Sequence, residues 1–157
     1  MEGTQHDESD VFRAVAESGA RALLIGRQAL IALGSPVLSA DFDFWIHIDD
    51  IEKLNAAFGA IEHLPNKTAA EARATGRYAI ENGLKVDVMV ARGKTAPGGE
   101  VLDFDDAWSR KQAVELFGST IFIPSIADLI VTKRWGSRDR DLVDIQWLEA
   151  LRRGANQ

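Results

Sequence analysis

The chain has 157 residues, of which 46% are hydrophobic and 27% are charged, values ordinary for a globular protein that buries a core. A net charge of −6 argues against a broad nucleic-acid-binding face, and the absence of cysteine excludes disulfides, thiolate metal sites and thiol nucleophiles. No apolar run reaches the roughly eighteen residues of a membrane span, and the polar, acidic N-terminus is unlike a signal peptide, so we expect a cytoplasmic protein without membrane contacts.

The first half of the chain alternates helix and strand patterns. We expect a flexible tail over residues 1–8 and a single domain over residues 9–153. The predicted elements are a helix near 10–18 capped by Ser9, a strand over 21–25 ended by Gly26, a helix over 28–33 closed by Gly34, a strand over 41–48, a helix from Asp49 to about Phe58, and an Ala-rich helix over 68–75.

The second half contains a hairpin signal: residues 77–81 and 84–90 flank Asn82-Gly83, a typical two-residue turn. The remaining predicted elements are a surface loop over 91–100, a helix around 104–110, short strands near 113–117 and 120–123 joined by Gly118-Ser119, a helix from Pro124-Ser125 to Gly136, and a helix over 138–153. A hairpin in place of successive βαβ units favours an α+β fold.

Two aspartates stand two residues apart in the apolar strand 41–48. Residues at this spacing share a face of a strand, with Cα atoms roughly 6–7 Å apart, so Asp41 and Asp43 point the same way. Two carboxylates this close repel each other unless a cation lies between them, and oxygen-only ligands suit Mg²⁺. The alternative is a pair of carboxylates that simply faces water on an edge strand.

A third aspartate, Asp87, is the only acid in the apolar run LKVDVMVA. Aspartate is depleted in strands and is almost never buried without a partner. If strands 41–48 and 84–90 are neighbours, three carboxylates converge, as a pair of divalent ions requires to align a hydroxyl with a triphosphate. Asp87 would then be a general base or a metal bridge. The alternative is a carboxylate paired with Lys85 or with an arginine.

The order of these residues resembles the nucleotidyltransferase superfamily, which has a polymerase-beta-like fold. In that superfamily a strand ends at Gly-Gly or Gly-Ser, a short helix follows, and a later strand carries Asp-x-Asp. The matching residues are Gly26-Arg27-Gln28-Ala29-Leu30, Gly34, Asp41-Phe42-Asp43 and Asp87. The stretch IADLIVTKRWGSRDRDLVDIQWL is similar to the abortive-infection, type IV toxin-like branch, in which one helix supplies a Lys and an R-x-x-D-x-x-D helix supplies an Asp.

The resemblance, which covers about residues 21–50, 77–91 and 123–150, implies a mixed, mainly antiparallel sheet packed against helices, with two C-terminal helices. It also implies that Asp41, Asp43 and Asp87 are the catalytic, metal-binding triad. Gly26 would let the backbone approach the triphosphate, and the amides that open the next helix would hold phosphate oxygens. Lys133 matches the helix lysine and Asp141 the helix aspartate of the nucleotide site, with Asp144 a near alternative.

Helical spacing supports a special position for Lys133. It extends the apolar stripe formed by Ile126, Leu129 and Ile130, where a lysine can either reach a phosphate or extend its ammonium group out to solvent. Ser125-x-x-Asp128 matches a capping box, so we assign Asp128 a structural role. Asp141 and Asp144 could instead pair with Arg138, Arg140 or Lys133.

Two positions depart from the superfamily pattern. Arg27 stands where Gly or Ser is preferred, and Val37 stands where an Arg often follows the Gly-x-Pro turn. A cation near a helix N-terminus is unfavourable, so Arg27 needs a partner. That partner is either the triphosphate, with Arg27 replacing the charge missing at Val37, or Asp41 or Asp43, in which case metal binding is blocked.

Other residues carry weaker signals. Core packing is the expected role of most tryptophans, although Trp45 shares the face of Asp43 and could stack on a base. The basic residues Lys133-Arg134, Arg138, Arg140 and Arg152-Arg153 are interleaved with acids, which favours a solvated helix face over an RNA-binding surface.

The expected activity is therefore Mg²⁺-dependent transfer of a nucleoside monophosphate from an NTP to an acceptor hydroxyl. The resemblance implies acceptors such as tRNA ends, proteins or small molecules, and the toxin-like branch implies an antitoxin partner. Two alternatives stay open. One is an inactive nucleotide-binding module, and the other is a protein-interaction module that keeps only the fold.

Overall fold

The computed structural model describes residues 7–92, 101–135 and 138–155. Within these ranges the helices are α1 (Glu8–Glu17), α2 (Gly26–Ala32), α3 (Ile51–Gly59), α4 (Ala69–Thr75), α5 (Phe104–Ser109), α6 (Ile126–Arg134) and α7 (Asp139–Ala155), with a short 3₁₀ helix η1 (Ile48–Asp50) before α3. The strands are β1 (Ala22–Ile25), β2 (Asp41–His47), β3 (Leu64–Pro65), β4 (Arg77–Asn82), β5 (Leu84–Ala91), β6 (Gln112–Leu116) and β7 (Ser119–Ile123). Most of the loop predicted over 91–100 lies outside the described residues.

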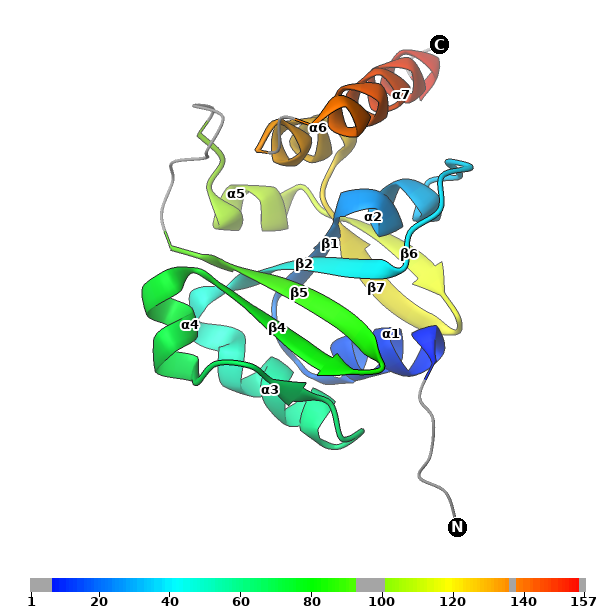
Figure 1. The fold of residues 1–157 in the computed structure, drawn as a ribbon. Helices are drawn as coiled ribbons and strands as arrows, with labels where there is room; N and C mark the ends of the chain where they lie inside the picture. The colour runs from blue at the N-terminus through cyan, green and yellow to red at the C-terminus, as the bar shows by residue number, and fades with distance from the viewer. Residues whose placement is uncertain (1–6, 93–100, 136–137, 156–157) are drawn as a thin grey trace.

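A five-stranded sheet in the order β1-β2-β5-β4-β3 forms the centre of the structure (Figure 1). Only β2 and β5 are parallel, and the other neighbouring strands are antiparallel. Strands β6 and β7 form a separate two-stranded sheet. Helices α1 and α3 lie on one side of the large sheet, and α2, α6 and α7 lie on the other. The predicted α+β class with a mainly antiparallel sheet is confirmed.

Burial separates the two faces of β2 and β5. Phe42, Phe44, Val86 and Val88 are fully buried, and the ring of Phe12 in α1 meets the ring of Phe42 edge-on with centroids 5.6 Å apart. The aspartates next to them differ: Asp41 is exposed, and Asp43 and Asp87 are half-buried. The sheet is therefore fixed by the hydrophobic core under one face, which leaves the aspartates on the face toward α2 and α6.

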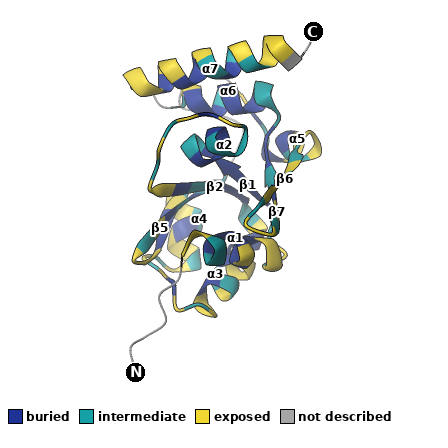
Figure 2. Cartoon of the chain, turned by 90° about the vertical axis from the view of Figure 1, so that its right-hand side faces the viewer, coloured by how far each residue is buried: buried dark blue, intermediate teal, exposed yellow. Residues whose placement is uncertain are grey.

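Helix α7 is the outermost element on that side. Figure 2 shows exposed residues along its outer surface and buried residues where it packs on α6. Among the described residues, none of the helices is both long enough and apolar enough for a membrane span.

Three predicted boundaries are corrected by the structure. Asp7, not Ser9, caps α1, because its carboxylate accepts hydrogen bonds from the amides of Ser9 and Asp10 and Asp10 completes a capping box. Helix α2 begins at Gly26, before the predicted start at residue 28. The turn between β6 and β7 is centred on Phe117 and Gly118, whose φ angles of 52° and 83° suit a tight hairpin.

Candidate active site

The three aspartates come together on one face of the sheet. Strands β2 and β5 are neighbours, as predicted, and their register places Asp43 directly opposite Asp87. Asp41 precedes Asp43 by two residues and shares its face. We call Asp41, Asp43 and Asp87 the sheet carboxylates.

The sheet carboxylates repel one another. Burial raises the pKa of Asp43 above its ordinary value, and the negative charges of Asp87 and Asp41 raise it further, while the cations Lys133 and Arg77 oppose the shift. Asp87 lies 3.6 Å from the ammonium of Lys85, in an ion pair that is largely exposed to solvent. The pairing of Asp87 with Lys85, which the sequence left open as an alternative, is therefore present, but it leaves Asp43 without a neutralising neighbour of comparable proximity among the described residues.

The donor chemistry of the sheet carboxylates fits Mg²⁺, since all the ligand atoms on offer are carboxylate oxygens. A cation between them would relieve the repulsion that raises the pKa of Asp43. The side chains are not gathered into a closed cage: within the three described ranges, no group of three His, Cys, Asp or Glu residues is arranged to hold an ion. Asp41 and Asp87 are both accessible to solvent, so their carboxylates have room to turn toward a cation.

Gly26 lies against this group at the point where β1 becomes α2. Its φ of +69° belongs to the left-handed region that glycine tolerates. A Cβ atom added to Gly26 would lie 2.6 Å from Oδ2 of Asp43, which is too close for any side chain. Both constraints favour glycine, and the close contact reflects the pairing of Ile25 with Asp43 across β1 and β2.

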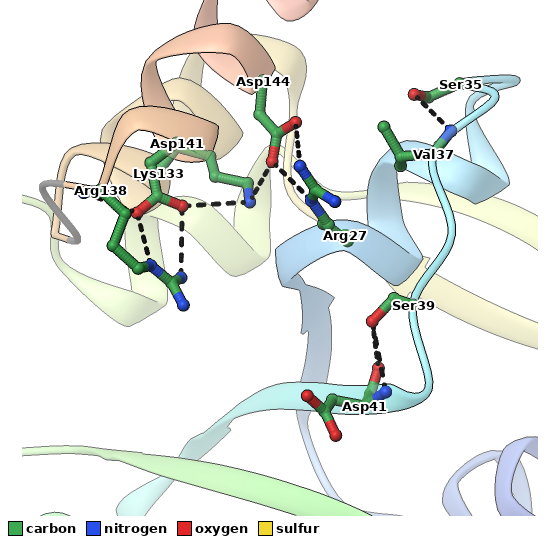
Figure 3. A network of polar contacts seen from close by, with 9 residues as sticks. All are labelled: Arg27, Ser35, Val37, Ser39, Asp41, Lys133, Arg138, Asp141 and Asp144. Carbon is green, nitrogen blue, oxygen red and sulfur yellow. Dashed lines mark hydrogen bonds and ion pairs between the residues drawn. The ribbon is translucent and has the colours of Figure 1, made fainter.

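Five charged residues from α2, α6 and α7 form a second group, which we call the helix ion-pair network (Figure 3). Its members are Arg27, Lys133, Arg138, Asp141 and Asp144. Asp144 accepts hydrogen bonds from Lys133 Nζ at 2.7 Å and from Arg27 Nε at 3.2 Å. Asp141 accepts from Arg138 Nε at 2.9 Å and lies 3.5 Å from Lys133 Nζ.

The network is internally paired, and three of its members are buried, whereas the side chain of Arg138 is 60% exposed. The side chains of Asp144, Asp141 and Lys133 are 1%, 2% and 6% exposed. Burial alone would raise the pKa of Asp141, but hydrogen bonds from the side chain and backbone of Arg138 and the charge of Lys133 hold it below its ordinary value. Lys133 thus lies on the buried face, as predicted, and its ammonium stays inside with Asp144.

Arg27 has a partner that the sequence did not indicate. Its guanidinium binds Asp144 on α7, so the alternative in which Arg27 pairs with Asp41 or Asp43 is wrong. Asp144 offsets the cost of a cation at the start of α2. Metal binding at the sheet carboxylates is therefore not blocked by Arg27 in this structure.

Two structural assignments also change. Ser125 accepts a hydrogen bond from the amide of Asp128, as a cap should, but the Asp128 carboxylate binds Arg110 at 2.9 Å and 3.1 Å instead of completing the capping box. Trp45 is buried, with its ring 4.9 Å from Phe104 and 5.2 Å from Trp135 between centroids, so it belongs to the core and is not exposed for base stacking.

A cavity of about 490 Å³ lies between the two charged groups. Its lining includes Gly26, Asp43, Lys133, Arg138 and one further cation, Arg77. Sequence reasoning missed Arg77, although the hairpin signal could have found it. Counting back from the Asn82-Gly83 turn places Arg77 opposite Met89, on the same face as Asp87.

No protein-family model matches the sequence, and the curated proteins yield no match either. Among solved structures, the chain is similar to a Thermotoga maritima protein provisionally assigned as a nucleotidyltransferase, with a TM-score of 0.58 and 18% sequence identity over 93% of this chain and 88% of that one. At this identity the likeness shows the fold alone. The chain thus has the nucleotidyltransferase-like fold that the resemblance in its sequence implies.

Proposed function

We propose that this protein is a nucleotidyltransferase that transfers a nucleoside monophosphate from an NTP to an acceptor hydroxyl. The observation that carries the proposal is the register of β2 and β5, which sets Asp43 opposite Asp87 beside a glycine that cannot be replaced without a clash. A fold alone hosts many functions, so it is this local arrangement, and not the fold, that supports the proposal.

The sheet carboxylates would hold Mg²⁺, which when bound neutralises phosphate charge and favours ionisation of a hydroxyl. The backbone at Gly26 lets a phosphate approach α2 closely, and Lys133 and Arg138, which line the cavity, supply positive charge there. Arg27 does not line the cavity, but it shares the carboxylate of Asp144 with Lys133. Asp141 would keep Arg138 and Lys133 oriented toward the nucleotide.

The chemistry is a single displacement at the α-phosphorus. The acceptor oxygen forms a bond to phosphorus as Asp87 takes its proton. The bond to the bridging oxygen breaks, and pyrophosphate leaves with the electron pair. Most of the rate enhancement would come from positioning and from charge neutralisation. The toxin-like branch, a tRNA acceptor and an antitoxin partner stay predictions.

The helix ion-pair network favours a second candidate, a protein-interaction or nucleotide-binding module without catalysis. Lys133 and Arg27 are already neutralised by Asp144 within the protein, so neither cation requires a nucleotide. An active enzyme has to draw these cations from Asp144 toward the phosphates, whereas an inactive module would leave them in place.

Thermal unfolding with each NTP, with and without Mg²⁺, separates the candidates. A ligand present at a hundred times its Kd adds roughly 2.7 kcal/mol to the stability of the folded state, which raises Tm by several degrees. We expect the shift to require Mg²⁺ and to be lost in Asp43→Asn and in Asp87→Asn, each compared with its own ligand-free Tm. The control is Glu17→Gln, which removes an exposed carboxylate from α1.

A shift that needs no Mg²⁺, or that survives in Asp43→Asn, would identify a nucleotide-binding module and contradict the proposed chemistry. No shift with any nucleotide would favour the protein-interaction module. Where a shift is seen, release of pyrophosphate with a labelled NTP then tests transfer directly.

A further inference from the structure

Arg77 differs from the other cations of the cavity because its guanidinium has no partner among the described residues. Lys133 and Arg138 each bind an aspartate of the helix ion-pair network. The Arg77 guanidinium makes no hydrogen bond or ion pair with any residue in the part of the chain that the structure describes, although it lines the same cavity as Asp43. Within that part of the chain, it is thus the cation of this cavity that can accept an anion without first breaking an ion pair.

Arg77 lies on the opposite side of the cavity from Gly26 and Lys133, which are the proposed phosphate-binding residues. Gly26 and Lys133 lie on the side of β1, α2 and α6, whereas Arg77 begins β4, which is two strands away from β2 across β5. Arg77 lies opposite Met89, two residues along β4 from Ala79, the residue that shares a row with Asp87 and Asp43. Strands are spaced about 4.8 Å apart, so the two backbones are about 10 Å apart, a gap that an arginine side chain can partly bridge.

The geometry of phosphoryl transfer indicates which substrate group would lie near Arg77. In phosphoryl transfer the attacking oxygen and the leaving oxygen lie on opposite sides of the phosphorus. If pyrophosphate leaves on the α2 side, then the acceptor hydroxyl must arrive from the side of β5 and β4. Lys85 is also on this face, but it is bound to Asp87 and does not line the cavity.

We infer that Arg77 binds the acceptor, and that the acceptor carries a phosphate close to its reactive hydroxyl. The inference rests on the proposed function, because it takes the side of the leaving group from that function. A guanidinium matches phosphate with two parallel hydrogen bonds, which gives orientation as well as attraction. The phosphate could belong to the terminal nucleotide of an RNA or to a phosphorylated small molecule.

The test measures binding of a defined acceptor probe to protein already saturated with Mg²⁺ and an α,β-methylene NTP analogue, which cannot undergo transfer. The probe is uridine 5′-monophosphate, with uridine as the match that lacks the phosphate. We expect wild type to prefer the monophosphate and Arg77→Gln to weaken its binding by about tenfold, the loss typical of one charge-assisted contact. Binding of uridine and of the NTP analogue should change by less than about twofold.

Two variants control for general effects of charge. Arg77→Lys keeps the charge but loses the two-pronged geometry, so it should recover part of the monophosphate affinity. Arg13→Gln removes an exposed arginine from α1, across the sheet from the cavity, and should change nothing. A trinucleotide, UpUpU, distinguishes the sources: tighter Arg77-dependent binding than the monophosphate points to an RNA end, and equal binding points to a small molecule.

The inference is overturned if wild type does not prefer the monophosphate or if the preference survives in Arg77→Gln. It is also overturned if Arg77→Gln weakens the NTP analogue as much as the probe, since Arg77 would then serve the triphosphate. Failure of wild type to bind the analogue with Mg²⁺ would remove the proposed function and this inference together. If binding of the analogue depends on Asp43 but not on Arg77, and Arg77→Gln leaves binding of the probe unchanged, then the inference fails and the proposed function stands.

Discussion

Two groups of charged residues border one cavity, and they differ in how their charges are paired. The helix ion-pair network combines three cations with two carboxylates, each held by hydrogen bonds of 2.7–3.2 Å. The sheet carboxylates set negative charges side by side, and the pKa of Asp43 is raised by burial and by its acidic neighbours. Each carboxylate of the network is bound by two cations, whereas among the described residues the sheet carboxylates have one close cation, Lys85 beside Asp87.

The difference indicates which group is adapted to a ligand. A buried ion pair contributes little net stability, but removal of one partner is costly because the other charge is left without compensation. Like charges held together, by contrast, cost free energy until a cation arrives. We therefore interpret the network as the part of the cavity that is stabilised within the protein before a ligand binds, and the sheet carboxylates as the part that a bound cation would stabilise.

The largest expected effect comes from Asp144→Ala. The substitution leaves Lys133 and Arg27 without their shared carboxylate, and such losses typically cost about 3–5 kcal/mol. Urea unfolding of the variant and wild type measures the change directly, provided the slope of the transition stays constant.

Glu149→Ala is the matched control, because it removes an acid from the same helix. Glu149 lies 3.8 Å from Arg134 in a pair whose side chains are 42% and 43% exposed, and such pairs contribute about 0–1 kcal/mol. If the two variants lose similar stability, then the helix ion-pair network does not stabilise the ligand-free protein in the way we infer.

Asp43→Asn should have a smaller effect of opposite sign. It removes the carboxylate whose ionisation is disfavoured, so the metal-free protein should gain on the order of 1 kcal/mol at neutral pH, or about 2–4 °C in Tm. Thermal unfolding in chelator measures this gain.

The pH dependence of the stability difference tests whether the ionised Asp43 carboxylate is its cause. Because the pKa of Asp43 is raised in the folded state, its protonation stabilises the fold below the ordinary value of 3.8, and this contribution is lost as pH rises through the raised pKa. The advantage of Asp43→Asn should thus vanish at low pH and grow toward neutrality. A variant that is less stable than wild type at pH 7 without metal would show that the sheet carboxylates are not in conflict.

Local patterns predicted much of this fold. Period-2 alternation placed β2, and the Asn82-Gly83 signal placed the hairpin of β4 and β5, because both signals depend on residues close together in sequence. Caps were less predictable. Asp7 and Ser9 are both good N-cap residues, and the capping box at Asp7 is completed by the hydrogen bond that its amide donates to the Asp10 carboxylate.

In the candidate site too, local features could be predicted from the sequence and long-range contacts could not. The shared face of Asp41, Asp43 and Asp87 followed from strand periodicity once β2 and β5 were taken as neighbours. The partner of Arg27 did not, because Asp144 lies 117 residues away on a helix whose packing no local pattern fixes. Long-range ion pairs are set by tertiary packing, so a sequence can indicate that Arg27 needs an acid without indicating which one.

The smallest expected effect on stability comes from a substitution of Lys85, the exposed cation next to the sheet carboxylates. Its ion pair with Asp87 is 3.6 Å long and its side chain is 53% exposed, so Lys85→Gln should change stability by less than about 0.5 kcal/mol. Mg²⁺ affinity should nevertheless rise about three- to fivefold at low salt, because a positive charge next to a ligand is removed, and the gain should shrink as salt screens it. Calorimetric titration of Mg²⁺ at two salt concentrations measures both changes. Weaker binding in Lys85→Gln would mean that Lys85 orients Asp87 for the metal and does not compete with it. The sheet carboxylates would then be held in place by an ion pair before a ligand binds, as the carboxylates of the helix ion-pair network are.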